Sequence, residues 1–483
     1  MSEKNVMSNF IWRFAERCGA QVVSLIVSVV LARILSPDDY GTVALVTVFT
    51  TILQVFVDSG LGVALIQKKD ADDLDFSSVF YFNLLVCVVL YTGMFVCAPV
   101  IAKFYGRPEL VKIVRVISLT ILISGVKNIQ QAYVSRNMLF KKFFWATIGG
   151  TVFSAVLGIA MAYSGFGVWS LVAQSLSNTF IDTVILWIIV RWRPRMVFSW
   201  KRLKKLLSYG WKLLASALLD TGYNNLRNLI IGKMYSSADL AYYTQGDKLP
   251  LVLVNNINTS IDSVLLPSMS QAQDNKERVK AMTRKSITVS IYIMAPLMIG
   301  LAVCSPALVK LVFTEKWLPC VFYLRIFCIT YIFYPVHTAN LNALRAIGRS
   351  DLFLKLEIEK KLVGFGLLFC TMWFGVDAMA YSLLVSTLTS MLINCSPNKK
   401  ILSYSFKEQM KDIFPSLALA CLMGGIVLIE LLIPIPTFAM LVLQATTGIV
   451  VYAAFSKAFH LKEFEFLVSV LINTLQNKKE HKK

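Results

Sequence analysis

Residues 9–35 read NFIWRFAERCGAQVVSLIVSVVLARIL, a stretch apolar enough to cross a membrane that nevertheless carries three charges in its first half. Its polar side chains follow one another in steps of three or four: Arg13, Arg17, Gln21, Ser24 and Ser28. That spacing places them on one side of an α-helix. Charged groups inside a bilayer face protein or water rather than lipid. The stretch therefore predicts a membrane helix with one polar face.

The composition of the whole chain agrees with a membrane protein. Of the 483 residues 56% are hydrophobic and 16% are charged, and the mean hydropathy is +0.64. A soluble domain has about 25% charged residues. We therefore expect an all-α, polytopic membrane protein.

Cysteines and histidines give no sign of a metal centre or a disulfide framework. The nine cysteines contain no CxxC pair, and the three histidines lack ligand spacing. Cysteines scattered through apolar runs are typical of small buried side chains. We expect no cofactor and no metal, and the N-terminus lacks the features of a cleavable signal.

A membrane helix needs about 20 mostly apolar residues. Charged, proline-rich and glycine-rich punctuation divides the chain into about fourteen such spans: 9–35, 41–67, 76–102, 110–134, 143–163, 167–190, 209–233, 246–267, 285–313, 318–343, 352–374, 376–397, 412–433 and 437–457. The seventh and eighth spans are the least apolar. Twelve or thirteen crossings are the alternatives.

Lysine and arginine residues orient these spans. With the N-terminus in the cytoplasm, 33 of the 48 lie in cytoplasmic segments, eight lie on the opposite side and seven lie inside spans. Such a bias predicts a multi-pass protein with both termini in the cytoplasm. It also accounts for most of the net charge of +20 without a nucleic-acid partner. The basic segment 191–205 either follows this rule or binds anionic lipid headgroups.

The chain contains an internal repeat. LARILSPDDYG (31–41) resembles IGKMYSSADLA (231–241) at an offset of 200, and SGFGVWSLVAQSL (164–176) resembles MWFGVDAMAYSLL (372–384) at an offset of 208. We therefore expect a six-helix lobe over 1–206, a second over 207–400, and two added helices with a basic tail over 401–483. Parallel repeats of this kind bind substrate near their shared interface.

Polar faces recur in matching spans of both halves and predict a hydrated central cavity. Its candidate substrate-binding residues are Arg13, Arg17, Lys127, Asn128, Gln131, Asn224, Arg227 and Arg325. Its candidate coupling or cavity carboxylates are Asp58, Asp220 and Asp262. Buried guanidinium and ammonium groups favour an anion, and the guanidinium fork suits phosphate oxygens.

Several of these residues have a structural alternative. Arg13 is close enough to the cytoplasmic boundary to extend its charge to the surface. Arg17 has Glu16 as a neighbour, and Asp220 and Arg227 are placed to neutralise each other. Lys127 has no counter-charge nearby in the sequence.

Two further residues favour a structural reading. Arg325 lies towards the outer interface. We expect His337 to be a hydrogen-bonded packing residue.

Five short stretches resemble the polysaccharide transporter family of the multidrug/oligosaccharidyl-lipid/polysaccharide exporter superfamily: LARILSPDDYG (31–41), DSGLGVALIQKKD (58–70), LLPSMSQAQDN (265–275), LVFTEKW (311–317) and ALRAIGRSD (343–351). The resemblance implies a flippase of the bacterial cytoplasmic membrane. It would move a polyprenyl diphosphate carrying an O-antigen or exopolysaccharide repeat unit between leaflets by alternating access. The resemblance also implies a monomer that works with membrane lipids, a glycan polymerase and chain-length machinery.

Two other functions remain open at this point. An ion-coupled drug or organic-cation antiporter of the same superfamily needs a cavity dominated by carboxylates, whereas the charges here are mixed and largely basic. A membrane enzyme of glycan polymerisation needs catalytic groups on a sizeable outer loop, and the outer connections in this sequence are short. We therefore expect a transporter rather than an enzyme.

Overall fold

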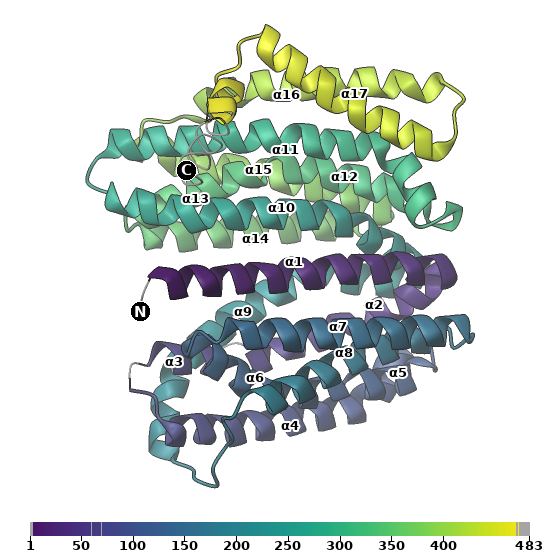
Figure 1. The fold of residues 1–483 in the computed structure, drawn as a ribbon, viewed down its shortest axis with the longest axis vertical. Coiled ribbons are helices and arrows are strands. Elements are labelled where there is room, and N and C mark those ends of the chain that lie inside the picture. The colour runs from purple at the N-terminus through teal and green to yellow at the C-terminus, as the bar shows by residue number, and fades with distance from the viewer. Residues whose placement is uncertain (1–2, 59, 69, 470–471, 473–483) are drawn as a thin grey trace, which may run out of the picture. The chain divides into compact units, whose positions relative to one another are not determined.

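The computed structural model describes residues 3–58, 60–68, 70–469 and 472, and all regular structure in that part of the chain is helical. For residues 3–11, 13–15, 17–18, 209, 260, 263–264 and 350 it describes the backbone alone. The helices, labelled in Figure 1, are α1 (Glu3–Ile34), α2 (Pro37–Asp58), α3 (Leu61–Gln67), α4 (Asp73–Tyr105), α5 (Leu110–Ile117), α6 (Leu119–Arg136), α7 (Phe140–Tyr163), α8 (Val168–Ile189), α9 (Trp200–Met234), α10 (Ser237–Gln271), α11 (Lys276–Val312), η1 (Glu315–Trp317), α12 (Cys320–Ile332), α13 (Tyr334–Ala346), α14 (Ser350–Thr371), α15 (Val376–Ile401), α16 (Phe406–Ile429), η2 (Glu430–Leu432) and α17 (Thr437–Ala458).

Each predicted span coincides with one helix or with an interrupted pair. The interrupted pairs are α2 with α3, α5 with α6, and α12 with α13. The last two are the fourth and tenth spans, which the repeat treats as equivalent. Their breaks fall at Ser118 and Phe333, 215 residues apart. The two halves therefore also share the position at which the helix of the fourth span is interrupted.

The break after α2 depends on a glycine. Gly60 has a φ of 99°, a conformation that side chains disfavour. A Cβ atom there would lie 2.5 Å from the carbonyl oxygen of Gly210 on α9. Helix α9 therefore passes directly against the point where the second span is interrupted.

Nine helical segments in the described residues are long and apolar enough to cross a membrane. The five remaining predicted spans, which are α1, α5 with α6, α9, α10 and α14, are absent from this set. The first four of these spans contain the polar residues from which the sequence predicts a functional face. The protein is a multi-pass membrane protein, and the count of fourteen crossings stays a prediction.

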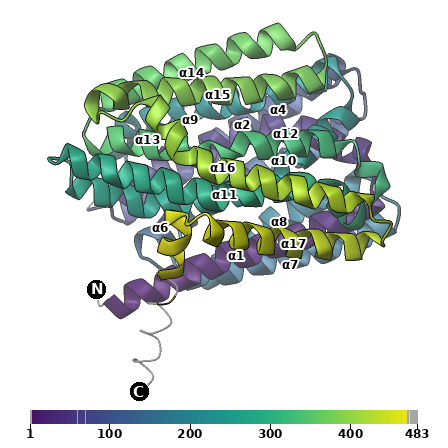
Figure 2. The same ribbon diagram turned by 90° about the horizontal axis from the view of Figure 1, so that it is seen from above.

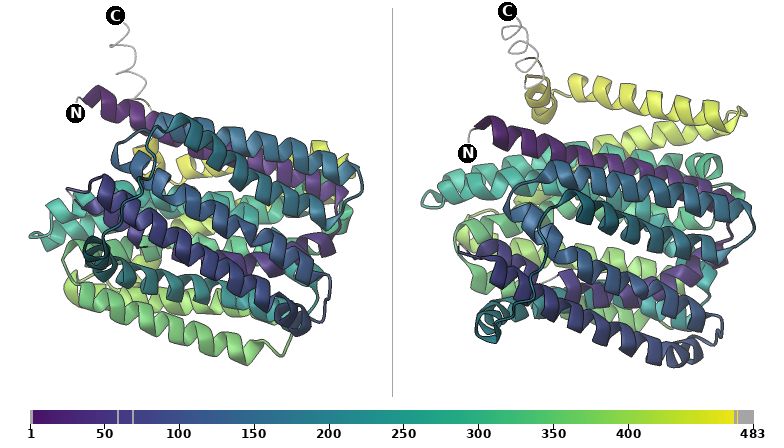
Figure 3. Two further views of the ribbon diagram at one scale, coloured as in Figure 1. Left: turned by 90° about the horizontal axis from the view of Figure 1, so that it is seen from below. Right: turned by 60° about the horizontal axis from the view of Figure 1, so that its bottom comes forward.

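The chain divides into two compact units, residues 1–241 and residues 242–483. Within unit 1, α7 packs against both α1 and α8, and Figure 3 shows these purple to blue helices running side by side. The predicted lobe boundaries at 206 and 400 stay predictions.

The hydrophobic core of unit 1 gathers side chains from α3, α4, α6, α7 and the start of α9. Trp192, which precedes α9, is 8% exposed and stacks on Tyr133 with ring centroids 6.0 Å apart. Leu203 and Leu206 of α9 are buried in the same cluster. The first two turns of α9 thus belong to the core of unit 1.

In unit 2, α11 packs against α12, α16 and α17, an arrangement that can be followed in Figure 2. An apolar cavity of about 510 Å³ lies among α11, α16 and α17. Its few polar lining side chains include Gln444 and Tyr452. Tyr452 donates a hydrogen bond to the carbonyl oxygen of Tyr292 at 2.8 Å, so α17 is tied to α11 beside this cavity.

Candidate functional site

A polar cavity of about 430 Å³ lies inside unit 1, among α2, α6, α8 and α9. Its lining is rich in hydroxyl groups and contains one charged residue, Asp58. Polar and ionisable groups among membrane helices usually mark a pathway for substrate or ions. This cavity is therefore the candidate functional site of unit 1.

Eight side chains with a hydroxyl group line the cavity, and half of these hydroxyl groups are left to act as acceptors. Four of them donate their hydrogen to a carbonyl three or four residues earlier in the same helix: Thr47, Thr50, Thr120 and Thr179. A hydroxyl that has donated its hydrogen keeps only lone pairs for other groups. The cavity consequently offers acceptors to whatever enters it.

Asp58 is the last residue of α2 and its side chain is exposed to the cavity. Its Oδ1 accepts hydrogen bonds from Gln54 Nε2 at 3.0 Å and from Asn128 Nδ2 at 3.1 Å. The prediction placed Asp58 and Asn128 among the candidate site residues, and the structure brings these two together across α2 and α6. Sequence reasoning missed Gln54, although it lies one helical turn before Asp58.

A second carboxylate–amide pair occurs in unit 2. Asn342 Nδ2 donates to Asp262 Oδ1 at 2.6 Å and joins α13 to α10. Asp58 and Asp262 are 204 residues apart, and Asn128 and Asn342 are 214 residues apart. The first offset lies between the 200 and 208 of the sequence repeat, and the second is close to the 215 residues that separate the breaks of the fourth and tenth spans. Each half of the chain therefore fixes one aspartate of its second span with one asparagine of its fourth span.

Lys127 is held in an ion pair. Its Nζ lies 3.0 Å from Asp182 Oδ2 on α8, and the two side chains are 16% and 14% exposed. Asp182 is 55 residues away in the sequence, which is why no partner was found near Lys127. The part of Lys127 in cargo binding stays a prediction.

The other predicted cations are more dispersed. The side chains of Arg13 and Arg17 lie outside the described residues. Arg227 is half-buried on α9. Arg325 donates from Nε to the carbonyl oxygen of Ala302 at 3.2 Å.

The contact made by Arg325 has a counterpart in the first half. Arg115 Nε donates to the carbonyl oxygen of Phe95 at 3.3 Å. Each arginine thus joins the fourth span of its half to the third. The repeat gives Arg325 a helix-joining role, and its predicted contact with cargo is untested.

The remaining predicted residues sit on α6, α9 and α13. Gln131 is half-buried. Asn224 Nδ2 donates to Asp220 Oδ2 at 3.3 Å, so these two candidates bind each other on α9. His337 Nδ1 lies 2.9 Å from Asn394 Nδ2, as expected for a packing residue. In the described part of the chain, no three His, Cys, Asp or Glu side chains gather as metal ligands.

The repeated motif itself forms the same turn twice. Asp39 Oδ2 accepts from the backbone and hydroxyl of Ser36, at 3.0 and 2.6 Å, and Asp39 N donates to Ser36 Oγ at 3.2 Å. Asp239 and Ser236 repeat all three bonds, at 3.1, 2.6 and 3.0 Å. Such reciprocal caps satisfy the free N–H groups of a helix start. The resemblance at an offset of 200 is therefore a match of local structure.

These two turns meet at Arg107, in a cluster that the sequence did not reveal. Arg107 binds both carboxylate oxygens of Asp38, at 2.7 and 3.1 Å, and the hydroxyl of Ser237 at 2.5 Å. Gly41 makes the approach possible, since a Cβ atom there would lie 1.8 Å from the carbonyl oxygen of Ser237. The starts of α2 and α10 are thus held in close contact.

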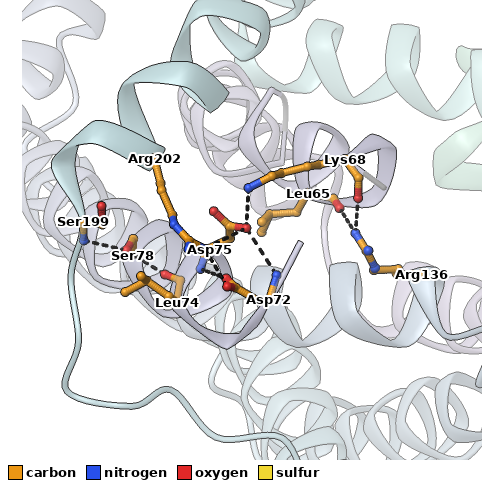
Figure 4. A network of polar contacts seen from close by, with 9 residues as sticks. All are labelled: Leu65, Lys68, Asp72, Leu74, Asp75, Ser78, Arg136, Ser199 and Arg202. Carbon is orange, nitrogen blue, oxygen red and sulfur yellow. Dashed lines mark hydrogen bonds and ion pairs between the residues drawn. The ribbon is translucent and has the colours of Figure 1, made fainter. Parts of the chain in front are cut away.

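Figure 4 shows a second network, at the start of α4. Buried Asp75 accepts from Lys68 Nζ at 2.5 Å, and Arg202 of α9 lies 2.5 Å from Asp72 Oδ2. The Arg202 guanidinium lowers the pKa of the Asp72 carboxyl to about 2. Arg136 donates to the carbonyl oxygens of Leu65 and Lys68 at the end of α3, at 2.7 and 2.5 Å. The Asp72–Asp75 spacing of a capping box was the available signal for this network.

Residues 30–322 match a family described as polysaccharide biosynthesis protein. The chain is 27% identical over 319 residues to the succinoglycan biosynthesis transport protein ExoT of Rhizobium meliloti, covering 66% of this chain and 64% of ExoT. It is 27% identical over 356 residues to the teichuronic acid biosynthesis protein TuaB of Bacillus subtilis, covering 72% and 73%. It is 24% identical over 345 residues to the lipopolysaccharide biosynthesis protein WzxC of Escherichia coli, covering 70% and 69%.

Two kinds of solved structure share the fold. The lipid II flippase MurJ, in an inward closed conformation, superposes with a TM-score of 0.75 at 14% identity and covers 93% of this chain and 99% of MurJ. An inward-facing multidrug resistance transporter of the MATE family superposes with a TM-score of 0.61 at 15% identity, covering 80% and 94%. At these identities the likeness concerns the fold alone.

Proposed function

Because the chain belongs to the polysaccharide biosynthesis protein family, we propose that it is a flippase for polyprenyl-diphosphate-linked oligosaccharide repeat units. The relatives ExoT, TuaB and WzxC are named for the biosynthesis of three different surface polysaccharides, and ExoT is named as a transport protein. These names have the biosynthesis of a polysaccharide in common, and we infer that the cargo of this chain is a repeat unit on a lipid carrier. It passes from the cytoplasmic to the outer leaflet of the bacterial cytoplasmic membrane.

The observation that carries this proposal is the polar cavity in unit 1. A cavity of about 430 Å³ with a carboxylate and several hydroxyl groups lies among α2, α6, α8 and α9. Polar groups at membrane depth are costly, and packing against lipid tails does not require them. A hydrophilic cargo that crosses the bilayer is a reason for them to be there.

The diphosphate of the cargo requires cations. Arg13 and Arg17 on α1 and Arg227 on α9 are the residues that we assign to it, since a guanidinium binds phosphate oxygens in a two-point geometry. Lys127 joins them when the anion competes with Asp182, its partner at 3.0 Å. With an inside-negative membrane potential, outward movement of each net negative charge is favoured by about 2.3 kcal/mol per 100 mV.

Alternating access is the mechanism that the repeat supports. Two parallel six-helix repeats suit a rocking motion that opens the cargo site first to one side and then to the other. The excess of lysine and arginine in one set of connections supports cytoplasmic termini, and therefore loading from the cytoplasmic side.

The test is deletion of the gene followed by analysis of lipid-linked intermediates in both leaflets. We expect one complete repeat unit on its polyprenyl carrier to accumulate in the cytoplasmic leaflet, and complementation with the wild-type gene to clear it. Arg17→Glu should fail to clear it while inserting normally.

Three outcomes would contradict the proposal. Unchanged lipid-linked intermediates together with lost efflux of organic cations would indicate a drug antiporter. Glycans of altered length would indicate an enzyme. Full complementation by Arg17→Glu would remove this arginine from the mechanism.

A further inference from the structure

The carboxylate–amide pairs Asp58–Asn128 and Asp262–Asn342 have a chemistry that the cationic part of the proposed mechanism does not use. We propose that both aspartates bind hydroxyl groups of the cargo's sugar rings, one binding point in each half of the chain. This inference rests on the proposed function, because it assigns the saccharide part of the same cargo.

The geometry leaves one carboxylate oxygen of each aspartate available. Gln54 and Asn128 both donate to Oδ1 of Asp58, and Asn342 donates to Oδ1 of Asp262. Within the described residues no hydrogen bond or ion pair reaches Oδ2 of either aspartate, and both side chains are exposed. The amides therefore fix the carboxylate while Oδ2 stays accessible to a donor from outside the protein.

The neighbouring residues repeat as well. At the offset of 204 that relates the two aspartates, Thr51 corresponds to Asn255 and Gln54 to Asn258. These residues precede each aspartate by seven and four positions, so they lie on the same helix face as it does. Each half thus presents a polar ridge that ends in a fixed carboxylate.

Charge decides which part of the cargo fits this ridge. Asp58 is the one charged residue in the lining of its cavity, and the ammonium group of Lys127 forms its ion pair with Asp182. A carboxylate surrounded by hydroxyl acceptors repels a diphosphate and attracts donors. Sugar hydroxyls are neutral donors, and an O–H···O⁻ bond to a carboxylate is about twice as strong as a neutral one.

The size of the cavity is also suitable. Its volume of about 430 Å³ lies within the range of roughly 300–1,000 Å³ typical of ligand sites. That is room for a small group of sugar rings and excludes the polyprenyl chain. A monovalent cation would be attracted by the same acceptors, and the experiment separates the two occupants.

The experiment measures binding of two lipids to the purified full-length protein in nanodiscs. One probe is bare polyprenyl diphosphate, and the other is the same lipid carrying a neutral disaccharide. We expect Asp58→Asn and Asp262→Asn each to weaken binding of the glycosylated lipid by about tenfold to a hundredfold, the loss typical of one hydrogen bond to a charged group. Binding of the bare lipid should not change.

Matched controls come from the same repeat. Asp70 and Asp274 are exposed carboxylates, again 204 residues apart, and each lies twelve residues after one of the two aspartates. Asp70→Asn and Asp274→Asn should bind both lipids as the wild type does. Asp58→Glu, which keeps the charge and displaces it by one methylene group, should weaken binding of the glycosylated lipid alone and guards against a folding artefact of the asparagine variant.

Each remaining outcome is decisive. Equal losses of binding for both lipids in Asp58→Asn would overturn the inference. Lipid affinity that is unchanged in Asp58→Asn but no longer varies with sodium or pH would also overturn it and would assign a cation to the site. A wild-type protein that binds both lipids equally would overturn the inference and leave the proposed function standing. A wild-type protein that binds neither lipid would instead overturn the proposed function.

Discussion

The two halves of the chain share the carboxylate–amide pair and differ in the residue beside it. Asn128 and Asn342 correspond at an offset of 214, and at that offset Lys127 corresponds to Leu341. Lys127 forms an ion pair with Asp182 in unit 1. Leu341 is apolar and cannot form an ion pair. Both halves therefore have a hydrogen-bonded aspartate, and beside its asparagine the first half has a lysine in an ion pair where the second half has a leucine.

This difference separates two kinds of polar contact. A pair that recurs after a duplication serves something that both halves do, such as holding the second and fourth spans in register or contacting an extended cargo. A pair found in one half serves that half alone. The following predictions test matched positions of this kind.

The largest effect is expected at the unmatched charge pair. Lys127→Met leaves the carboxylate of Asp182, which is 14% exposed, without its counter-ion. Loss of one partner of a fully buried pair typically costs about 3–5 kcal/mol, and we expect a loss towards the lower end of that range. The free energy of unfolding in detergent should fall accordingly. Lys127→Met combined with Asp182→Leu, which gives unit 1 the apolar character of the second half, should recover most of the loss. A double variant as unstable as the single one would show that the pair itself is not the source.

A smaller effect is expected where Gly41 of the first half corresponds to Ala241 of the second. Gly41→Ala places a methyl group 1.8 Å from the carbonyl oxygen of Ser237, and overpacking of this kind costs about 1–3 kcal/mol. Ala241→Gly should cost about 1 kcal/mol through the flexibility of glycine in a helix. Thermal unfolding followed by tryptophan fluorescence measures both. Equal losses at the two positions would contradict the close approach at Gly41.

The smallest effect concerns two helix caps. Asp72 caps α4, the third span, and Asn275 caps α11, the ninth. Arg202 lowers the pKa of Asp72 to about 2, against about 3.9 in an unfolded chain. This carboxylate therefore contributes stability above pH 4 that is lost as the pH falls towards 2. Because its side chain is 52% exposed, the contribution should be below about 1 kcal/mol.

Asparagine does not titrate, so Asp72→Asn should remove the loss of stability that Asp72 causes at acid pH. Asn275→Asp should introduce a similar loss of stability at acid pH into unit 2. The measurement is the midpoint of unfolding between pH 2 and pH 5. An unchanged acid profile in Asp72→Asn would indicate that other carboxylates govern it.

The helices could be predicted from the sequence because a run of about 20 apolar residues between charged connections has one stable arrangement in a bilayer. The repeat could be predicted because capping residues are local: Ser36 and Asp39 are three positions apart and bind each other in any helix start of this kind. The same reasoning found the duplicated turn at Ser236 and Asp239.

The pairing of the site residues could not be predicted. Asp58, Asp262 and Asn128 were each selected for their polarity, yet the partners lie 70 and 80 residues apart in the sequence. Helical periodicity gives the face of a residue and leaves open which helix that face meets. Asp182 was not considered for the same reason. Arg107 was missed because its partners Asp38 and Ser237 lie 69 and 130 residues away in the sequence.

The anchoring of α9 in unit 1 has a consequence for how the protein is made. When synthesis has reached residue 206, the predicted end of the first lobe, unit 1 still lacks most of α9 and the turn that carries Ser237. Translation of the next 35 residues, up to Ala241, takes about 2–7 s at 5–20 residues per second. During that interval α2 lacks its neighbour α9, whose Thr221 completes the lining of the polar cavity.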